Sequence, residues 1–157
     1  MCGRYNLHSS KEVRVLLDSI GLPDFVPPDR FNIAPTESVP MVFEQSGQRV
    51  VQEARWWLTP SWSGGPSTKY AMFNARSETL STSRAFKAPF KRQRCIIPAS
   101  SFIEWQTIDG NKQPYDVKPR GAAIAFAGLW DVWQGDEGPL YSCTIVTADA
   151  TDNFRHI

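Results

Sequence analysis

The chain has 157 residues, 41% of them hydrophobic, with 17 basic and 16 acidic side chains and a formal net charge of +1. A chain of this length buries roughly 68–70% of its unfolded surface, so we expect one globular domain over residues 1–157. No apolar run is long enough to span a membrane, and the N-terminus lacks the apolar segment of a signal peptide, so we expect a cytoplasmic protein. The near-zero net charge excludes a protein coated in positive charge, and any nucleic-acid binding requires a local basic strip.

The first third of the sequence predicts one helix and one long loop. Serines at positions 9 and 10 suit a helix N-cap, apolar residues recur at helical spacing from Val13 to Ile20, and Gly21 suits the end. Five prolines between Leu22 and Pro40 favour a long ordered loop, because each fixes φ and removes a backbone donor.

Most of the remaining sequence predicts strands. Residues 39–43 and 49–58 flank a Ser46-Gly47 turn and predict a hairpin, and residues 60–66 predict a second loop. Short β-rich runs separated by glycine-containing turns follow at residues 94–97, 102–106, 115–118, 122–130 and 141–147. We therefore predict an α+β fold, with a curled, barrel-like, predominantly antiparallel sheet and a few short helices.

The end of the chain predicts at most a short helical start, and the cysteines and histidines predict neither disulfides nor a metal site. Thr151 and Asp152 resemble a helix start, but the chain ends at Ile157 after less than two turns. The cysteines, at positions 2, 95 and 143, are odd in number and lack Cys-x-x-Cys spacing, which argues against a disulfide framework and a cysteine zinc site. His8 and His156 have no partner at ligand spacing. We predict no metal and no cofactor.

Cys2 is the first candidate for chemistry. Removal of Met1 would leave a cysteine with a free α-amine, and both groups of such a 1,2-aminothiol are nucleophiles near neutral pH. The amine can form a Schiff base with an aldehyde, after which the thiol closes a five-membered thiazolidine. The alternative is that a cysteine at position 2 is incidental.

Glu104 is a second candidate, because it lies between apolar neighbours in an expected strand. Strand alternation places it on the same face as Phe102, where partial desolvation would suit a carboxyl group to general acid and base work. The alternative is a solvated strand glutamate.

Asn74 and Arg76 emerge abruptly after an apolar run at residues 70–73. Asparagine offers both a donor and an acceptor, and arginine offers a fork that matches phosphate. Equally, Asn74 fits a turn or helix cap, and Arg76 fits a structural ion pair with Glu78 or Glu104.

A basic run between Glu78 and Glu104 suggests a strip that tracks phosphates, alone or with Arg4 and Arg76. Its members are Arg84, Lys87, Lys91, Arg92 and Arg94. Four tryptophans offer stacking platforms for unpaired bases, namely Trp56, Trp57, Trp62 and Trp105. A solvated charged face and core tryptophans are the plainer interpretation.

Six blocks, in order along the chain, resemble the SRAP (SOS response-associated peptidase) family. They are residues 1–5 (Met-Cys-Gly-Arg-Tyr), 31–36 (Phe-Asn-Ile-Ala-Pro-Thr), 57–62 (Trp-Leu-Thr-Pro-Ser-Trp), 74–79 (Asn-Ala-Arg-Ser-Glu-Thr), 94–105 (Arg-Cys-Ile-Ile-Pro-Ala through Phe-Ile-Glu-Trp) and 144–147 (Thr-Ile-Val-Thr). The blocks are modest individually and specific together.

This resemblance implies a domain that recognises abasic sites in single-stranded DNA and crosslinks to them through Cys2 as a thiazolidine. It implies that Cys2 is the nucleophile, that Asn74 orients the opened sugar or the amine, and that Glu104 is the acid and base. The DNA-binding residues implied, or expected beside them, are Arg4, Arg76, Trp56, Trp57, Pro35, Asn32, Arg84 and Thr147. The expected partner is single-stranded DNA in the DNA-damage response, with no membrane or metal partner, and the expected state is a monomer, near the nucleoid if bacterial.

One departure from the family concerns the end of the chain. Family members continue after residue 147 into a helix that ends in an Ile-His-x-Arg-Met-Pro segment, whose histidine serves catalysis. This chain ends at Ile157, and His156 precedes that isoleucine instead of following it. We therefore expect the chain to lack the family's C-terminal segment, and no role is carried over to His156.

Three functions stay open on the residues alone. The first is an abasic-site crosslinking enzyme, with lyase activity when the imine undergoes β-elimination. The second is an N-terminal-nucleophile cysteine peptidase or amidohydrolase that frees Cys2 by self-cleavage and needs an amide and an oxyanion hole. The third is a non-catalytic single-strand DNA module in which Cys2 is incidental.

Overall fold

The computed structural model describes residues 2–150. The first half contains β1 (Tyr5–Leu7), α1 (Lys11–Ser19), β2 (Arg30–Ile33), β3 (Ser38–Gln45), β4 (Gln48–Trp56) and β5 (Asn74–Arg76). The second half contains the 3-10 turn η1 (Ser77–Thr79), α2 (Lys87–Arg92), β6 (Arg94–Ala99), β7 (Ser101–Ile108), β8 (Asn111–Val117), β9 (Ile124–Gly135) and β10 (Gly138–Thr147). The helix start expected at Thr151, and His156, lie outside the described residues.

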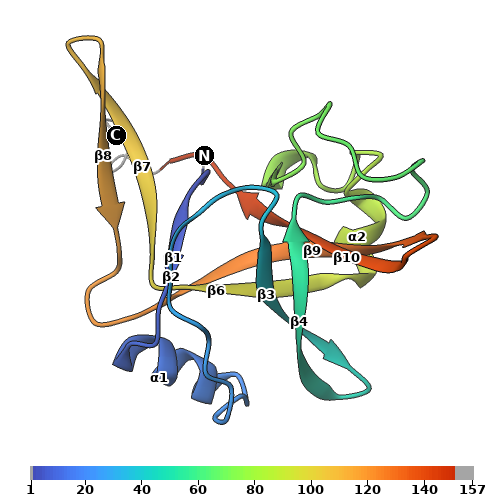
Figure 1. Ribbon diagram of the computed structural model, residues 1–157, viewed down its shortest axis with the longest axis horizontal. Coiled ribbons are helices and arrows are strands. Elements are labelled where there is room, and N and C mark those ends of the chain that lie inside the picture. The colour runs from blue at the N-terminus through green and yellow to red at the C-terminus, as the bar shows by residue number, and fades with distance from the viewer. Residues whose placement is uncertain (1, 151–157) are drawn as a thin grey trace.

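A closed barrel forms the larger body of the molecule (Figure 1). The strands run in the order β4-β3-β6-β9-β10-β5, and a parallel pairing between β4 and β10 closes the first five into a barrel. All the other pairings in the barrel are antiparallel. This confirms the predicted α+β fold with a curled, barrel-like sheet. Among the described residues, no helix is long and apolar enough to cross a membrane.

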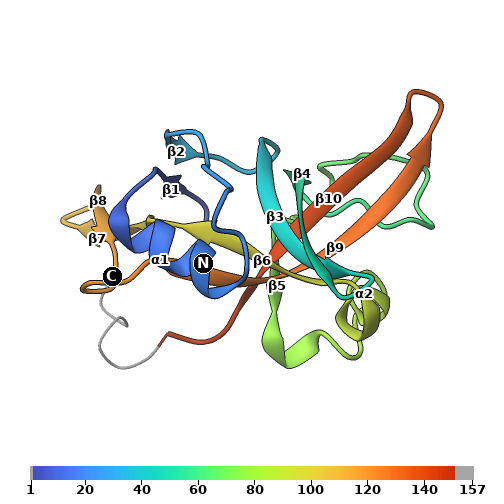
Figure 2. The same ribbon diagram turned by 90° about the horizontal axis from the view of Figure 1, so that it is seen from below.

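A second sheet, in the order β2-β1-β7-β8, joins the barrel at one corner. The chain passes from β6 of the barrel to β7 of this sheet with only Ser100 between them. Ser100 is buried, and its hydroxyl accepts from the His8 backbone N–H at 2.9 Å, which ties the corner to the end of β1. Figure 2 shows β1, β2 and α1 packed beside this corner.

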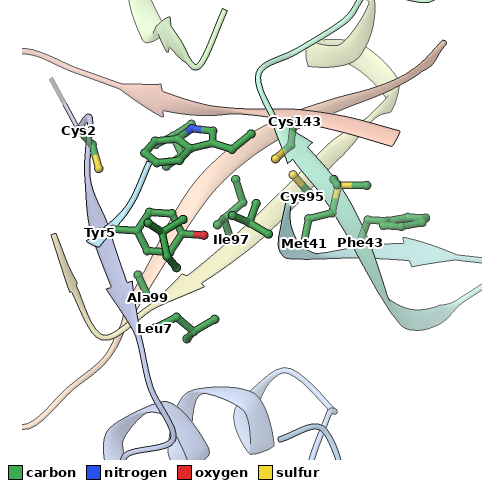
Figure 3. Packing of buried hydrophobic residues seen from close by; sticks show 14 of the residues in the cluster. Cys2, Tyr5, Leu7, Met41, Phe43, Cys95, Ile97, Ala99 and Cys143 are labelled. Carbon is green, nitrogen blue, oxygen red and sulfur yellow. The ribbon is translucent and has the colours of Figure 1, made fainter. Parts of the chain in front are cut away.

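One core runs through the barrel and under the second sheet. Figure 3 shows Cys2, Tyr5 and Leu7 from the N-terminal segment beside Ile97 and Ala99 from β6, with Cys95, Cys143 and Met41 deeper in the barrel. The Tyr5 ring meets Trp56 edge-on, with ring centroids 5.2 Å apart. The N-terminal segment therefore belongs to the core, which fixes the position of Cys2.

The local predictions hold in part. The Ser10 hydroxyl caps α1 by accepting from the Val13 N–H at 3.3 Å, and the hairpin is β3–β4 around residues 46 and 47. The loop predicted for residues 22–40 is wrong at residues 30–33, because β2 pairs there with β1. The sequence patterns did not indicate β1, β5 or α2, since each is too short to show a period.

Candidate functional site

Cys2 lies just before β1, at the edge of the core, with only 6% of its surface exposed. The Asn74 side-chain amide donates to the Cys2 carbonyl oxygen at 2.8 Å. The thiol lies 3.8 Å from the Arg4 carbonyl oxygen, toward which it donates. The backbone of Cys2 is therefore held in place from strand β5, which is 72 residues away in the sequence.

Asn74 is positioned by β5, of which it is the first residue, and by Phe73 just before it. β5 runs parallel to β10, with Asn74 opposite Ile145. The Phe73 carbonyl accepts from the Trp56 indole N–H at 2.9 Å and from the Ile145 N–H at 3.0 Å. Within the described part of the chain, the buried Asn74 side-chain oxygen has no hydrogen-bond partner. That oxygen is an acceptor available at the site.

Glu104 reaches the same place from β7. The Ile103 N–H donates to the Arg4 carbonyl at 2.8 Å, which brings the beginning of β7 alongside the residues just after Cys2. Burial raises the pKa of the Cys2 thiol to about 12, and the negative charge of Glu104 adds to the rise. The thiol is therefore protonated at neutral pH, close to a carboxylate. The structure thus brings together Cys2, Asn74 and Glu104. Their catalytic roles stay predictions.

Arg4 and Asn32 lie at the edge of this site, and Pro35 follows them along the chain. The Arg4 guanidinium donates to the Asn32 side-chain oxygen at 3.1 Å. Asn32 is exposed and adopts a left-handed φ of 56°. Pro35 is half-buried in the turn that joins β2 to β3. Their DNA-binding roles stay predictions.

Arg76 and Thr147 are neighbours, because β5 and β10 pair them directly. Both line a small cavity of about 170 Å³, whose other lining residues include Glu78 and Asp149. The arginine side chain is exposed. Its predicted contact with phosphate therefore requires no rearrangement of buried groups.

The stacking role predicted for Trp56 does not fit its position. Trp56 is fully buried, and its indole supports the Phe73 backbone beneath Asn74. Trp57 is half-buried, with its indole N–H on the Ser67 carbonyl at 2.9 Å and its ring 5.3 Å from Phe73. Both tryptophans therefore brace the segment that leads to Asn74.

The exposed indole of this region is Trp62, which is 53% exposed. The Arg84 guanidinium lies over it, 4.3 Å from the ring centroid. Trp62 also lines a cavity of about 390 Å³ together with Tyr70 and Met72. The sequence offers Trp62 and three other tryptophans equally as stacking platforms. The exposure of Trp62, which depends on the tertiary structure, distinguishes it from the others.

The basic run does not form one strip at the site. Lys87, Lys91 and Arg92 lie on α2, which both ribbon views place away from the start of the chain and β1 (Figures 1 and 2). Arg84 alone of this run contacts Trp62. The expected continuous basic strip is therefore wrong for Lys87 and Lys91, because both lie on α2, away from the start of the chain.

Metal and disulfide chemistry find no support in residues 2–150. All three cysteines are free and buried. Across those same residues, no group of three or more histidine, cysteine or acidic side chains is placed to hold a metal ion.

Comparison with known proteins finds similarity along the whole chain. The model of the family described as SOS response associated peptidase (SRAP) matches residues 1–157. The chain is 35% identical to the abasic site processing protein YoaM of Bacillus subtilis, covering 100% of this chain and 71% of that protein. It is 32% identical to the abasic site processing protein HMCES of Gallus gallus, covering 81% of this chain and 48% of that protein.

Solved structures show the same fold. A protein of Bordetella bronchiseptica matches with a TM-score of 0.78 at 25% identity, covering 98% of this chain and 75% of that one. A protein of Bacteroides thetaiotaomicron matches with a TM-score of 0.76 at 24% identity, covering 97% and 73%. With the family match spanning every residue, the chain belongs to the SOS response associated peptidase (SRAP) family.

Proposed function

We propose that this protein processes abasic sites in single-stranded DNA by forming a covalent thiazolidine crosslink through Cys2. The observation that carries the proposal is the convergence of Cys2, Asn74 and Glu104 from three separate strands or strand edges. The names of its relatives, abasic site processing proteins, support the same substrate. The protein would thus act in association with damaged DNA.

The reaction begins with the amine of Cys2, after loss of Met1. The opened sugar of an abasic site presents an aldehyde at C1′. The amine nitrogen bonds to this carbon and a water molecule leaves, giving an imine. The Cys2 sulfur then bonds to the same carbon while its proton moves to the nitrogen, which closes the five-membered ring. The net reaction loses one water molecule.

The electrostatics of the site favour this order of attack. Burial of the Cys2 sulfur disfavours the thiolate, and a protonated thiol is a weak nucleophile, so the amine attacks first. The Glu104 carboxylate then takes protons from the attacking amine and passes them to the departing oxygen, which leaves as water. During ring closure it transfers the thiol proton to the nitrogen. The side-chain oxygen of Asn74, which has no hydrogen-bond partner among residues 2–150, suits an acceptor for the Cys2 amine and would orient its lone pair.

The surface around the site suits an unpaired strand. Arg4, two residues after Cys2, and Arg76 with its pairing partner Thr147, two residues after Asn74, offer contacts to phosphates flanking the lesion. Trp62, backed by Arg84, offers a ring on which a base stacks. Of the tryptophans that the sequence offered as stacking platforms, Trp62 takes that role in this proposal, in place of Trp56 and Trp57, which the family resemblance favoured.

Two side activities follow from the same chemistry. If the imine loses a proton from C2′ before ring closure, the C3′–O bond breaks and the protein acts as a lyase. Release of Cys2 by cleavage of the Met1–Cys2 peptide bond would be the peptidase activity to which the family's name refers.

The test uses single-stranded DNA that carries one abasic site. The protein is incubated with it, denatured by heat, and examined for a shifted band and an intact mass. We expect the mass of the protein without Met1 plus the DNA minus one water. Cys2→Ala is the negative control, and Cys143→Ala is a matched control because that thiol is also free and buried but lies deep in the barrel.

Other outcomes would contradict the proposal. An adduct that survives Cys2→Ala places the chemistry on another residue. Reversible, salt-sensitive binding without any adduct supports a binding module instead, and hydrolysis of an amide substrate by the Cys2 protein supports a peptidase.

A further inference from the structure

Phe31 on β2 is the most exposed of the large hydrophobic side chains in the described chain, with 68% of its surface open to solvent. Burial of a phenylalanine ring stabilises a protein by about 1.5–3 kcal/mol, so its exposure forgoes a substantial gain. Single exposed apolar side chains are common on protein surfaces, so the case for a ligand depends on how this ring is held.

A β-bulge turns this ring outward. Tyr5 pairs with Ile33 and Leu7 pairs with Arg30, so the single residue Asn6 on β1 faces both Phe31 and Asn32 on β2. The extra residue is accommodated by the left-handed φ of 56° at Asn32. Asn6 stabilises that conformation, because its side-chain oxygen accepts from the Asn32 N–H at 2.7 Å. Bulges of this kind commonly re-aim a side chain beside a functional site.

The ring is held on one face and free on the other. The His8 imidazole stacks on Phe31 with ring centroids 5.6 Å apart and an angle of 20° between the planes. The backbone of His8 is fixed, since its N–H donates to the buried Ser100 hydroxyl at 2.9 Å. One face of the phenyl ring is therefore backed by the His8 imidazole, and the high exposure of Phe31 leaves room for a flat ligand on the other.

The bulge also links Phe31 to the cationic margin of the Cys2 site. Asn32, the second bulge residue, accepts from the Arg4 guanidinium at 3.1 Å. The four residue-to-residue steps from Cys2 to Asn6 span at most about 14 Å. At a stacking rise of roughly 3.4 Å per nucleotide, that span corresponds to about four nucleotides or fewer.

We propose that Phe31, backed by His8 and presented by the β2 bulge, is a stacking subsite for an unpaired base a few nucleotides from the lesion. This inference rests on the proposed function, because it takes single-stranded DNA as the ligand. It places a second base platform at the edge of the small sheet, separate from Trp62 on the loop after β4. The proposed DNA path thus extends on the Arg4 side of Cys2 as far as β2.

The test measures equilibrium binding with a reduced abasic site, which has no aldehyde and cannot crosslink. Thymidine oligonucleotides carry this site near one end and extend by about six nucleotides in either the 5′ or the 3′ direction. We expect Phe31→Ala to raise the dissociation constant roughly 5- to 150-fold for one direction of extension only. Phe31→Tyr keeps a ring and should stay near the wild type, whereas Phe31→Leu keeps apolar bulk without a ring and should resemble Phe31→Ala.

Val26→Ala is the matched control, because Val26 is also an exposed apolar residue, 57% exposed, before β2. It should bind both oligonucleotides as the wild type does. The inference is overturned if Phe31→Ala binds both as tightly as the wild type, or if Phe31→Leu does. Adduct formation by the wild type on an unreduced abasic site is read separately, so failure of the proposed function is distinguishable from failure of this subsite.

Discussion

The environment of Cys2 affects the reactivity of its sulfur and of its nitrogen differently. Its sulfur is buried and its carbonyl oxygen is held by Asn74, so loss of Met1 changes mainly the nitrogen. Burial and the Glu104 charge both disfavour the thiolate. The Glu104 carboxylate disfavours the Cys2 thiolate but assists proton transfer, so it should slow alkylation of the thiol and speed the crosslinking reaction.

Glu104→Gln should make the Cys2 thiol more reactive and the crosslinking reaction slower. Removing the negative charge lowers the pKa of Cys2, so alkylation by iodoacetamide at pH 8 should accelerate roughly two- to tenfold. Loss of the acid and base should slow adduct formation by about 10²- to 10⁴-fold. Peptide mapping by mass spectrometry gives the alkylation rate of Cys2, and denaturing gels give the rate of adduct formation.

Glu78→Gln provides the control for a change of charge alone, because Glu78 is an exposed acid beside Arg76. Both rates should stay close to those of the wild type. If Glu104→Gln slowed alkylation as well, the carboxylate would be stabilising the thiolate, and its assigned role would be wrong.

Among the elements, the loop between β4 and β5 shows how the barrel supports the site. The Thr59 N–H donates to the buried Ser142 hydroxyl at 2.8 Å, and the Ser61 N–H donates to the buried Asp131 carboxylate at 2.8 Å. The Trp133 indole donates to the Ser63 carbonyl at 3.0 Å. Strands β9 and β10 therefore fix the loop at three points on either side of Trp62, and a fixed ring loses less entropy on binding a base.

Asp131→Asn should loosen this loop. An amide can keep one acceptor oxygen, but its NH₂ group would then face either the Ser61 or the Val132 N–H, both of which now donate to the carboxylate. A lost hydrogen bond to a charged group costs about 1.5–3 kcal/mol. Hydrogen exchange should therefore quicken across residues 59–66, and single-stranded DNA should bind more weakly.

Asp136→Asn is the comparison for that experiment, since Asp136 is an exposed acid in the turn between β9 and β10. The exchange of residues 59–66 should not respond to it. Unchanged exchange in Asp131→Asn itself would mean that the other two attachments suffice to hold the loop.

The sequence predicted the elements that carry strong local signals. Ser10 and the helical spacing after it located α1, and the Ser46-Gly47 turn located the β3–β4 hairpin. Strand β2 was missed, because it depends on pairing with β1 and on a left-handed Asn32 that no residue pattern announces. Helix α1 and the hairpin are specified by capping and turn residues close in the sequence, whereas β2 forms only through pairing with a strand distant in the sequence.

The candidate site shows the same division. Cys2, Asn74 and Glu104 could be chosen from residue chemistry and family resemblance, and they do lie together. The tryptophans could not be sorted, because the exposure of Trp62 and the burial of Trp56 are decided by the barrel and not by the Trp-rich run itself.

For the molecule as a whole, the core contains several groups that ionise only at high pH. Burial raises the pKa of Cys2 and of Cys95 to about 12, and it raises the pKa of Cys143 and of Tyr5 well above their ordinary values. The unfolded chain releases a thiol proton near pH 9.0, while the folded chain keeps it to about pH 12. The stability from each neutral thiol is therefore complete below pH 9 and is lost as the pH rises toward 12.

The free energy of unfolding should consequently fall steeply above pH 9, by about 1.4 kcal/mol per pH unit for each buried thiol. Cys95→Ala removes one such group, so its slope against pH should be smaller by about one proton, whatever its absolute stability. Val42→Ala is the matched variant, because Val42 is a buried barrel residue with nothing to ionise, and it should lower stability without changing the slope. Denaturant unfolding between about pH 8 and 10.5 measures both quantities. A Cys95→Ala slope equal to that of the wild type would show that the Cys95 thiol ionises without cost in the folded barrel.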